Sequence, residues 1–220
     1  MPPLTTERLT FGRRFVRRGL LILVRLLYRV EYLGLDHVPA QGPLILVANH
    51  THLVDVLAIH CRVRPWISWV GKQELFRIPL LGRVLRWLGG IPVNRDKPDL
   101  ATARGIMQAL AQNGIVGMFP QGTRVPDAMI PYVRPRSGAA HFAKRLKVPL
   151  LPVAVSGRFR LLGRIRIIYG EPFHLQELPE YAEHAMSIND LAEAVMRRIY
   201  ALDGKEYTLL EPADDDESGN

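Results

Sequence analysis

Uninterrupted apolar runs constrain the fold of this chain more than any other feature of its sequence. Leu44–Ala48, Ile115–Phe119 and Leu150–Val155 contain no charged or hydrogen-bonding side chain. Short runs of this kind are typical of strands buried on both faces of a parallel sheet. Segments with helical patterns lie between or after them, at Asp99–Gln112, Gly138–Leu146 and Ile188–Leu202. This alternation predicts an α/β fold with a mostly parallel central sheet flanked by helices.

Chain length and cysteine content narrow the class of protein further. With 220 residues, 48% of them hydrophobic, the chain is long enough for one domain with a sizeable core, expected over residues 33–203. Cys61 is the only cysteine, which excludes an internal disulfide and the common four-cysteine zinc sites. A reducing compartment is the natural environment for such a chain.

Positive charge is in excess, which bears on the partners of the protein. The net charge is +8 although residues 204–220 are acidic and are expected to form a disordered tail. A strongly basic folded part favours nucleic acid, anionic lipid or phosphorylated substrates. Four arginines near one predicted strand would face a membrane, steer a ligand or carry plain solvated charge: Arg158, Arg160, Arg164 and Arg166.

The amino-terminal segment, residues 1–32, has the pattern of a basic amphipathic helix. On a helical wheel at ~100° per residue, Arg14, Arg18, Arg25 and Arg29 share one arc, and Phe15, Val16, Leu20, Leu23, Leu26, Leu27 and Val30 share another. The apolar side can enter an anionic membrane interface or pack on the protein's own core, and the two are compatible. With no apolar run of about 18 residues and no signal-peptide cleavage site, we expect peripheral or monotopic association rather than a spanning helix.

A histidine and an acid follow the first apolar run. Residues 49–55 read Asn-His-Thr-His-Leu-Val-Asp, at the end of a strand, where ligands of α/β proteins bind. His50 and Asp55 can meet if His50 lies in a loop and Asp55 lies early in a helix over Leu53–His60. The carboxylate would then fix the imidazole tautomer and leave the other nitrogen free to accept a proton. His50 is therefore a candidate general base; in the alternative it is an ordinary loop residue and Asp55 only complements the helix dipole.

Candidate phosphate-binding residues follow the run Ile115–Phe119. Gly122 permits close approach of a ligand to the backbone, and Thr123 and Arg124 supply a hydroxyl and a guanidinium as donors to phosphate oxygens. Together with other cations at the same sheet edge they would form an anion site, whereas separately they are an ordinary turn and surface charge. Two such cations are Lys72, after the predicted strand Ile67–Val70, and Arg95, after the predicted edge strand Ile91–Val93.

In their order along the chain, these motifs resemble those of the glycerolipid acyltransferases, the family of bacterial 1-acyl-sn-glycerol-3-phosphate acyltransferase. The family's Asn-His-x4-Asp signature is similar to residues 49–55, and its Phe-Pro-Glu-Gly-Thr-Arg signature to residues 119–124. Two further regions of the family resemble residues 72–95 and 148–154. The likeness extends from Leu33 to Pro172.

The resemblance implies transfer of a fatty acyl group from an acyl-carrier-protein or coenzyme A thioester to the hydroxyl of lysophosphatidic acid. The reaction would serve phospholipid synthesis at the cytoplasmic face of the cell membrane, on an anionic surface and without a cofactor or metal ion. His50 would deprotonate the hydroxyl for direct attack on the thioester, and Asp55 would orient His50. The residues expected to bind substrate are Gln121, Gly122, Thr123 and Arg124, with Lys72 and Arg95 as further candidates.

Gln121 departs from the family, which has Glu at this position. Gln keeps the size but loses the charge and one acceptor, so the acceptor could be another lysophospholipid, or the chain could be an inactive membrane-binding member. Two other classes compete with the acyltransferase. His50, His52 and Asp55 approach a metallohydrolase cluster, but Val56 stands where its last histidine is needed. The second is a basic module that binds anionic membrane or nucleic acid. Nucleic-acid binding favours exposed aromatics interleaved with basic residues, whereas the arginine stripe of this chain faces leucines, so membrane is the favoured partner.

Overall fold

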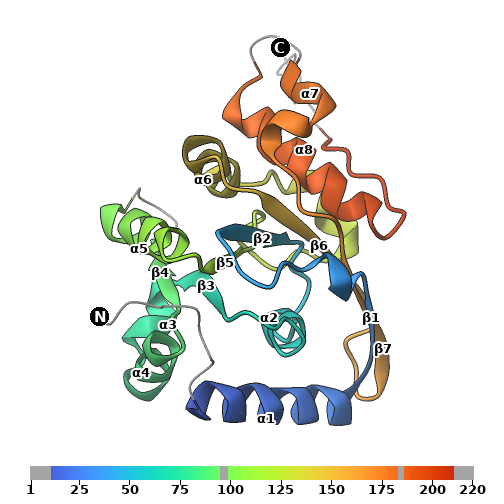
Figure 1. The fold of residues 1–220 in the computed structure, drawn as a ribbon. Coiled ribbons are helices and arrows are strands. Elements are labelled where there is room, and N and C mark those ends of the chain that lie inside the picture. The colour runs from blue at the N-terminus through green and yellow to red at the C-terminus, as the bar shows by residue number, and fades with distance from the viewer. Residues whose placement is uncertain (1–10, 95–98, 183–185, 211–220) are drawn as a thin grey trace, which may run out of the picture.

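The computed structural model describes residues 11–94, 99–182 and 186–210, and its centre is a seven-stranded sheet (Figure 1). Across the sheet the order is β1-β7-β6-β2-β5-β3-β4. β6 pairs with β7 in the antiparallel sense, and every other neighbouring pair of this sheet is parallel. The mostly parallel sheet expected from the sequence is confirmed. The strands are β1 (Tyr28–Leu33), β2 (Leu44–Ala48), β3 (Ile67–Lys72), β4 (Ile91–Val93), β5 (Ile115–Met118), β6 (Leu150–Gly157) and β7 (Gly163–Tyr169).

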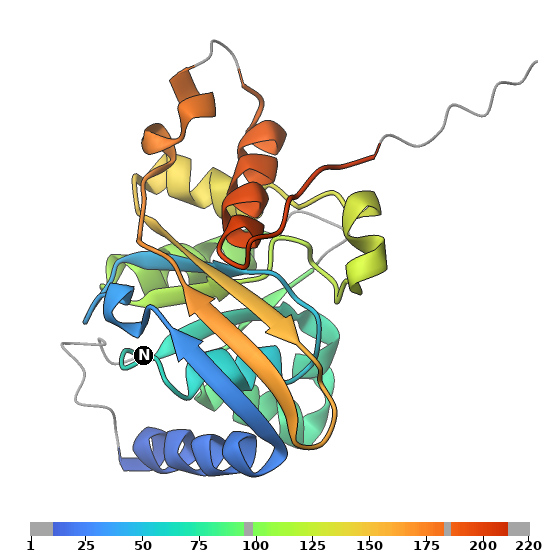
Figure 2. The same cartoon turned by 90° about the vertical axis from the view of Figure 1, so that its right-hand side faces the viewer.

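Helices cover both faces of the sheet, as Figures 1 and 2 show from two sides. One face carries α5 (Leu100–Ala111), α6 (Gly138–Leu146) and α8 (Ile188–Ala201), and the other carries α2 (Asp55–His60) with α1 (Phe11–Leu27) below it. The side chain of Asp99 caps α5 by accepting a hydrogen bond from the Ala101 N–H. The remaining helices are α3 (Gln73–Arg77), α4 (Pro79–Trp87), α7 (Pro179–Ala182) and the 3-10 turns η1 (Leu35–His37), η2 (Asp127–Tyr132) and η3 (Leu175–Glu177).

β2 shows why the apolar runs lack alternation. All of its residues are buried. Ile45 and Val47 pack toward α5, α6 and α8, whereas Leu44, Leu46 and Ala48 pack toward α1 and α2. A strand that is covered on both faces needs an apolar side chain at every position. Truncating a residue such as Leu46 to Ala would cost about 2–5 kcal/mol of stability.

The amphipathic helix ends earlier than the helical wheel predicted. α1 stops at Leu27, and Tyr28–Leu33 form the edge strand β1, which pairs with β7. The helical prediction was wrong for Arg29 and Val30, and residues 28–32 belong to the sheet. The backbone of these residues forms ladder hydrogen bonds with a strand that lies far along the chain, and burial alternates along β1.

α1 is packed on the core along only part of its surface. Val24 is buried in the core layer shared with α2. Five large apolar residues of the same helix remain exposed, and they are Phe11, Phe15, Ile22, Leu23 and Leu26. Among the helices of the described residues, none has the length and apolarity to cross a membrane. The tail expected to be disordered over residues 204–220 is packed on the domain over residues 204–210, where Tyr207 is buried and stacks on Tyr200 with ring centroids 5.3 Å apart, so the expectation was wrong for this part. Residues 211–220 lie outside the described residues.

Candidate active site

Two loops meet where β2 and β5 end. Residues 49–54 connect β2 to α2, and residues 119–126 follow β5. Because β2 and β5 are neighbouring parallel strands, both loops leave the sheet at the same edge. The peptide of His50 joins them: its N–H donates to Oε1 of Gln121 at 3.1 Å, and its carbonyl accepts from the Val125 N–H at 2.7 Å.

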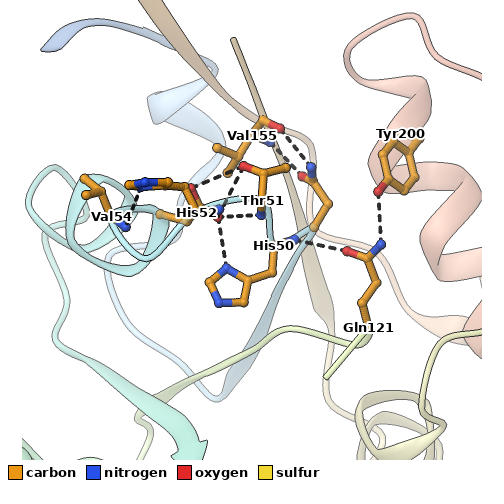
Figure 3. Close-up of polar contacts among 9 residues, drawn as sticks. His50, Thr51, His52, Val54, Gln121, Val155 and Tyr200 are labelled. Atoms are coloured by element: carbon orange, nitrogen blue, oxygen red, sulfur yellow. Dashed lines mark hydrogen bonds and ion pairs between the residues drawn. The ribbon is translucent and has the colours of Figure 1, made fainter. Parts of the chain in front are cut away.

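His50 and Asp55 form a hydrogen-bonded pair (Figure 3). Nδ1 of His50 lies 2.9 Å from Oδ2 of Asp55, the fully buried first residue of α2. The same oxygen accepts the backbone N–H groups of Thr51 and His52, each at 2.7 Å. Because an ionised carboxylate can only accept, it assigns the imidazole proton to Nδ1 and leaves the lone pair of Nε2 available. Nε2 is on the side of the ring opposite the Nδ1 bond to Asp55, and the His50 side chain is 14% exposed.

Aromatic rings support the imidazole of His50. Its ring stacks on Phe119 with centroids 4.1 Å apart, and Phe119 stacks on Trp69 at 5.0 Å. Gly117 makes room for this arrangement, since a Cβ there would lie 2.5 Å from Cε3 of Trp69. A flat ring on one side and a carboxylate at Nδ1 restrict rotation of the imidazole. Nε2 is thereby held in one direction.

Asn49 anchors the loop of His50 to the sheet. Its buried side-chain amide donates to the Val155 carbonyl at 2.8 Å and accepts from the Val155 N–H at 2.7 Å. These two bonds continue the pairing of β2 with β6 beyond Ala48 through a side chain. Asn49 therefore has a structural task in the signature that contains it.

The Gln121 side chain is buried, and both ends of its amide bind inside the protein. Oε1 accepts from the His50 N–H, and Nε2 donates to the hydroxyl of Tyr200 on α8 at 3.1 Å (Figure 3). Burial raises the pKa of Tyr200 to about 12, so its hydroxyl stays protonated at neutral pH. Sequence reasoning missed Tyr200 because it lies 79 residues from Gln121 and belongs to no motif.

The backbone conformation of the loop at residues 119–126 requires a glycine at position 122. Gly122 has a φ of 68°, and a Cβ there would lie 2.8 Å from Nε of Arg136. Arg136, which the motifs did not single out, therefore lies directly against this turn. Thr123 and Arg124 are exposed, and they immediately precede Val125, whose N–H binds the His50 carbonyl.

Two further cations were predicted for phosphate binding, Lys72 and Arg95, and the structure describes one of them. Lys72 ends β3 at the same edge of the sheet, is exposed, and forms an ion pair with Glu74 at 3.6 Å. An exposed pair of this kind contributes little to stability. Arg95 lies outside the described residues.

His52 has a different environment from His50. Its ring stacks on Phe159 with centroids 4.8 Å apart, and its Nδ1 accepts from the Val54 N–H at 3.3 Å. The two histidines thus turn to different partners and form no common ligand set. Within the part of the chain that the structure describes, no three His, Cys, Asp or Glu residues are grouped as metal ligands.

Known proteins resemble this sequence over long stretches. Residues 29–156 match the family described as "Acyltransferase". The 1-acyl-sn-glycerol-3-phosphate acyltransferase of Bacillus subtilis is 29% identical over 201 residues, which cover 87% of this chain and 97% of that protein. The enzyme of the same name from Escherichia coli is 32% identical over 152 residues, or 67% of this chain and 59% of that protein.

A solved structure shares the fold. The 1-acyl-sn-glycerophosphate (LPA) acyltransferase PlsC from Thermotoga maritima superimposes with a TM-score of 0.62 at 22% identity, over 90% of this chain and 85% of that chain. The family match begins on β1, ends on β6 and includes both loops around His50. Since it spans more than half of the sequence, this chain belongs to the acyltransferase family.

Proposed function

We propose that this protein is a 1-acyl-sn-glycerol-3-phosphate acyltransferase. It moves a fatty acyl group from an acyl-carrier-protein or coenzyme A thioester to the free hydroxyl of lysophosphatidic acid, and phosphatidic acid is the product. The observation that carries the proposal is the His50–Asp55 pair, with Nε2 of His50 directed away from the carboxylate at the sheet edge. The names of the relatives from B. subtilis and E. coli support the same reaction.

The geometry of this pair suits direct acyl transfer. Nε2 of His50 accepts the proton of the acceptor hydroxyl while the hydroxyl oxygen attacks the thioester carbonyl. The new C–O bond forms, the C–S bond breaks, and the departing thiolate takes the proton from His50. Asp55 stabilises the imidazolium that exists between these proton transfers. The chain has no Gly-x-Ser-x-Gly elbow, in agreement with a reaction without an acyl-enzyme.

The acceptor phosphate is assigned to the loop of residues 119–126. Gly122 is half-buried in a left-handed turn, and Thr123 and Arg124, which follow it, are exposed donors beside the loop of His50. Lys72 and Arg95 are further candidate cations. Gln121 was expected to contact substrate, but its burial and its two internal bonds favour a positioning role for the His50 backbone.

We assign the protein to the cytoplasmic face of the cell membrane as a peripheral or monotopic protein. The exposed apolar residues of α1 would lie in the bilayer interface, and Arg14, Arg18 and Arg25 are exposed on the same helix. In this assignment residues 11–27 contact the membrane, and the catalytic domain begins with β1.

Acyl transfer from a long-chain thioester to lysophosphatidic acid in mixed micelles tests the function. The native chain should form phosphatidic acid, and His50→Ala should lower kcat by about 10²–10⁴-fold. His52→Gln is the matched control, because it changes a neighbouring histidine whose imidazole stacks on Phe159 and does not bind Asp55, while the backbone N–H of residue 52 is kept. Equal rates from a folded His50→Ala variant would remove the mechanism. Product from Gln121→Glu alone would show that activity has diverged at that position.

A further inference from the structure

The hairpin between β6 and β7 ends in two exposed leucines. Leu161 is 71% exposed and Leu162 is 56% exposed. Leu162 also has a φ of 57°, a left-handed conformation in which Gly or Asn is usual and a larger side chain is strained. A leucine here stabilises neither the backbone nor the core. Strain and exposure at one position indicate that the side chain serves an interaction outside the domain.

The hairpin tip lies at the same end of the molecule as α1. The N–H of Leu162 donates to the carbonyl of Leu27, the last residue of α1, at 2.7 Å. Figures 1 and 2 both show the tip reaching the level of this helix. Leu23 and Leu26, near the end of α1, are 45% and 67% exposed. Two pairs of exposed leucines, from segments far apart in sequence, therefore share one end of the protein.

Arginines accompany these leucines. A cleft of about 460 Å³ at the hairpin is lined by Gly157, Leu162, Gly163 and four arginines, which are Arg29, Arg158, Arg160 and Arg164. Its lining contains no acidic residue. Arg166, by contrast, faces Glu31 at 2.9 Å and Asp203 at 3.8 Å, so its charge is balanced within the protein. Guanidinium groups bind phosphate bidentately, and the cleft therefore suits the phosphate of a lipid headgroup.

The hairpin also touches the loop of the candidate active site. Phe159 stacks on His52, which lies two residues from His50. A hairpin held at a membrane would therefore hold the 49–54 loop beside the surface that presents a lipid acceptor.

We propose that residues 158–164 form a second membrane contact beside α1, named here the hairpin anchor. Leu161 and Leu162 enter the interface of an anionic bilayer, and the arginine cleft binds the phosphate of an anionic lipid. Interfacial binding favours leucines that lie below the lipid headgroups and arginines that lie among the headgroups. The inference rests on the proposed function, because it places that site at a membrane.

The sharpest variant is Leu161→Ser/Leu162→Gly. Gly adopts a φ of 57° without strain, so the melting temperature should be unchanged or higher while both leucines are lost. Affinity for phosphatidylcholine vesicles that contain phosphatidylglycerol should fall by about tenfold or more. Leu210→Ser is the matched control. Leu210 is 52% exposed and belongs to the segment after α8, which lies away from α1 in Figure 2. The Leu210→Ser variant should bind the vesicles as the native chain does.

A charge variant tests the cleft separately. Arg160→Gln should lower affinity for the same vesicles by about fivefold at low salt, and hardly at all at high salt. Arg145→Gln removes one exposed charge from α6, on the opposite side of the molecule from α1, and should have a smaller effect. Equal losses from the two arginine variants would overturn the cleft as a headgroup site.

The hairpin anchor and the proposed function can fail separately. Undiminished vesicle binding by a folded Leu161→Ser/Leu162→Gly variant overturns the anchor, whatever the native chain does in the transfer assay. Absence of acyl transfer by the native chain in mixed micelles overturns the function, and vesicle binding still decides on the anchor.

Discussion

Oδ2 of Asp55 binds Nδ1 of His50 at 2.9 Å and also accepts the backbone N–H groups of Thr51 and His52. One carboxylate oxygen thus orients the imidazole and shapes the loop that carries it. Because Asp55 is the first residue of α2, the direction of the His50 ring depends on where that helix begins.

Asp55→Asn should therefore damage catalysis more than binding. An amide at this position can no longer stabilise the imidazolium and can favour the wrong tautomer, so kcat should fall by about 10²–10⁴-fold. Steady-state kinetics in mixed micelles measures the change, and thermal unfolding checks that the variant is folded. Asp127→Asn, which alters an exposed carboxylate paired with Lys205 at 3.4 Å, should keep native rates. A kcat within about threefold of the native value in Asp55→Asn would contradict the assigned role.

Gln121→Ala should lower kcat by about 10–100-fold with little change in the KM for lysophosphatidic acid. The side chain supports the His50 N–H, and a small displacement of a catalytic group has effects of this size. Gln121→Glu should restore most of the rate, because a carboxylate oxygen can accept from the His50 N–H and from the Tyr200 hydroxyl. Tyr200→Phe should have a milder effect than Gln121→Ala. If Gln121→Ala instead raised KM alone, direct contact with the acceptor would be the better assignment.

Arg124→Ala should weaken recognition of the acceptor phosphate. Losing a hydrogen bond to a charged group costs about 1.5–3 kcal/mol, so kcat/KM for lysophosphatidic acid should fall by about tenfold or more. Activity toward a monoacylglycerol, which lacks the phosphate, should change much less. Arg145→Ala on α6 serves as the control for loss of one positive charge. An unchanged preference for the phosphorylated acceptor would move the phosphate site elsewhere.

Because His60 is buried, we expect the folded protein to lose stability in mild acid. Burial, helped by the charges of Arg17 and Arg13, lowers its pKa to about 4, and its Nδ1 accepts from Nε1 of Trp69 at 3.3 Å. In the unfolded chain its pKa returns to about 6.5, so the unfolded state takes up the proton first. The stabilisation that neutral His60 gives to the folded state is therefore complete above about pH 6.5 and decreases as the pH falls toward 4. The free energy of unfolding should fall by about 2 kcal/mol between pH 7 and pH 5.

Urea unfolding at several pH values measures this effect. His60→Gln should be less stable at pH 7, yet its stability should depend less on pH between 7 and 5. Parallel pH profiles for the two proteins would show that another group causes the acid sensitivity.

Much of the fold was predictable because its signals are local. β2, β4 and α6 have the bounds that the sequence predicted, and β4 is the edge strand that was expected at Ile91–Val93. The meeting of His50 with Asp55 also followed from the sequence, since five residues separate them at the junction of a loop and a helix.

Other features depended on distant partners. β1 was included in a helix because its pairing with β7 joins residues more than a hundred positions apart, such as Val30 and Ile165. The bond between Gln121 and Tyr200 likewise requires α8 to fold back over the end of β5.

The sequence by itself determined the buried strands, the parallel class of the sheet and the histidine and acid at a strand end, because apolar runs and short spacings are local properties. The tertiary structure alone decided which part of α1 is buried, that residues 28–33 form a strand, and that Gln121 faces the interior. It also decided that Leu161 and Leu162 stand beside α1. The physical reason is that burial and hydrogen-bond partners of these residues are supplied by segments remote in sequence, whose approach depends on packing of the whole domain.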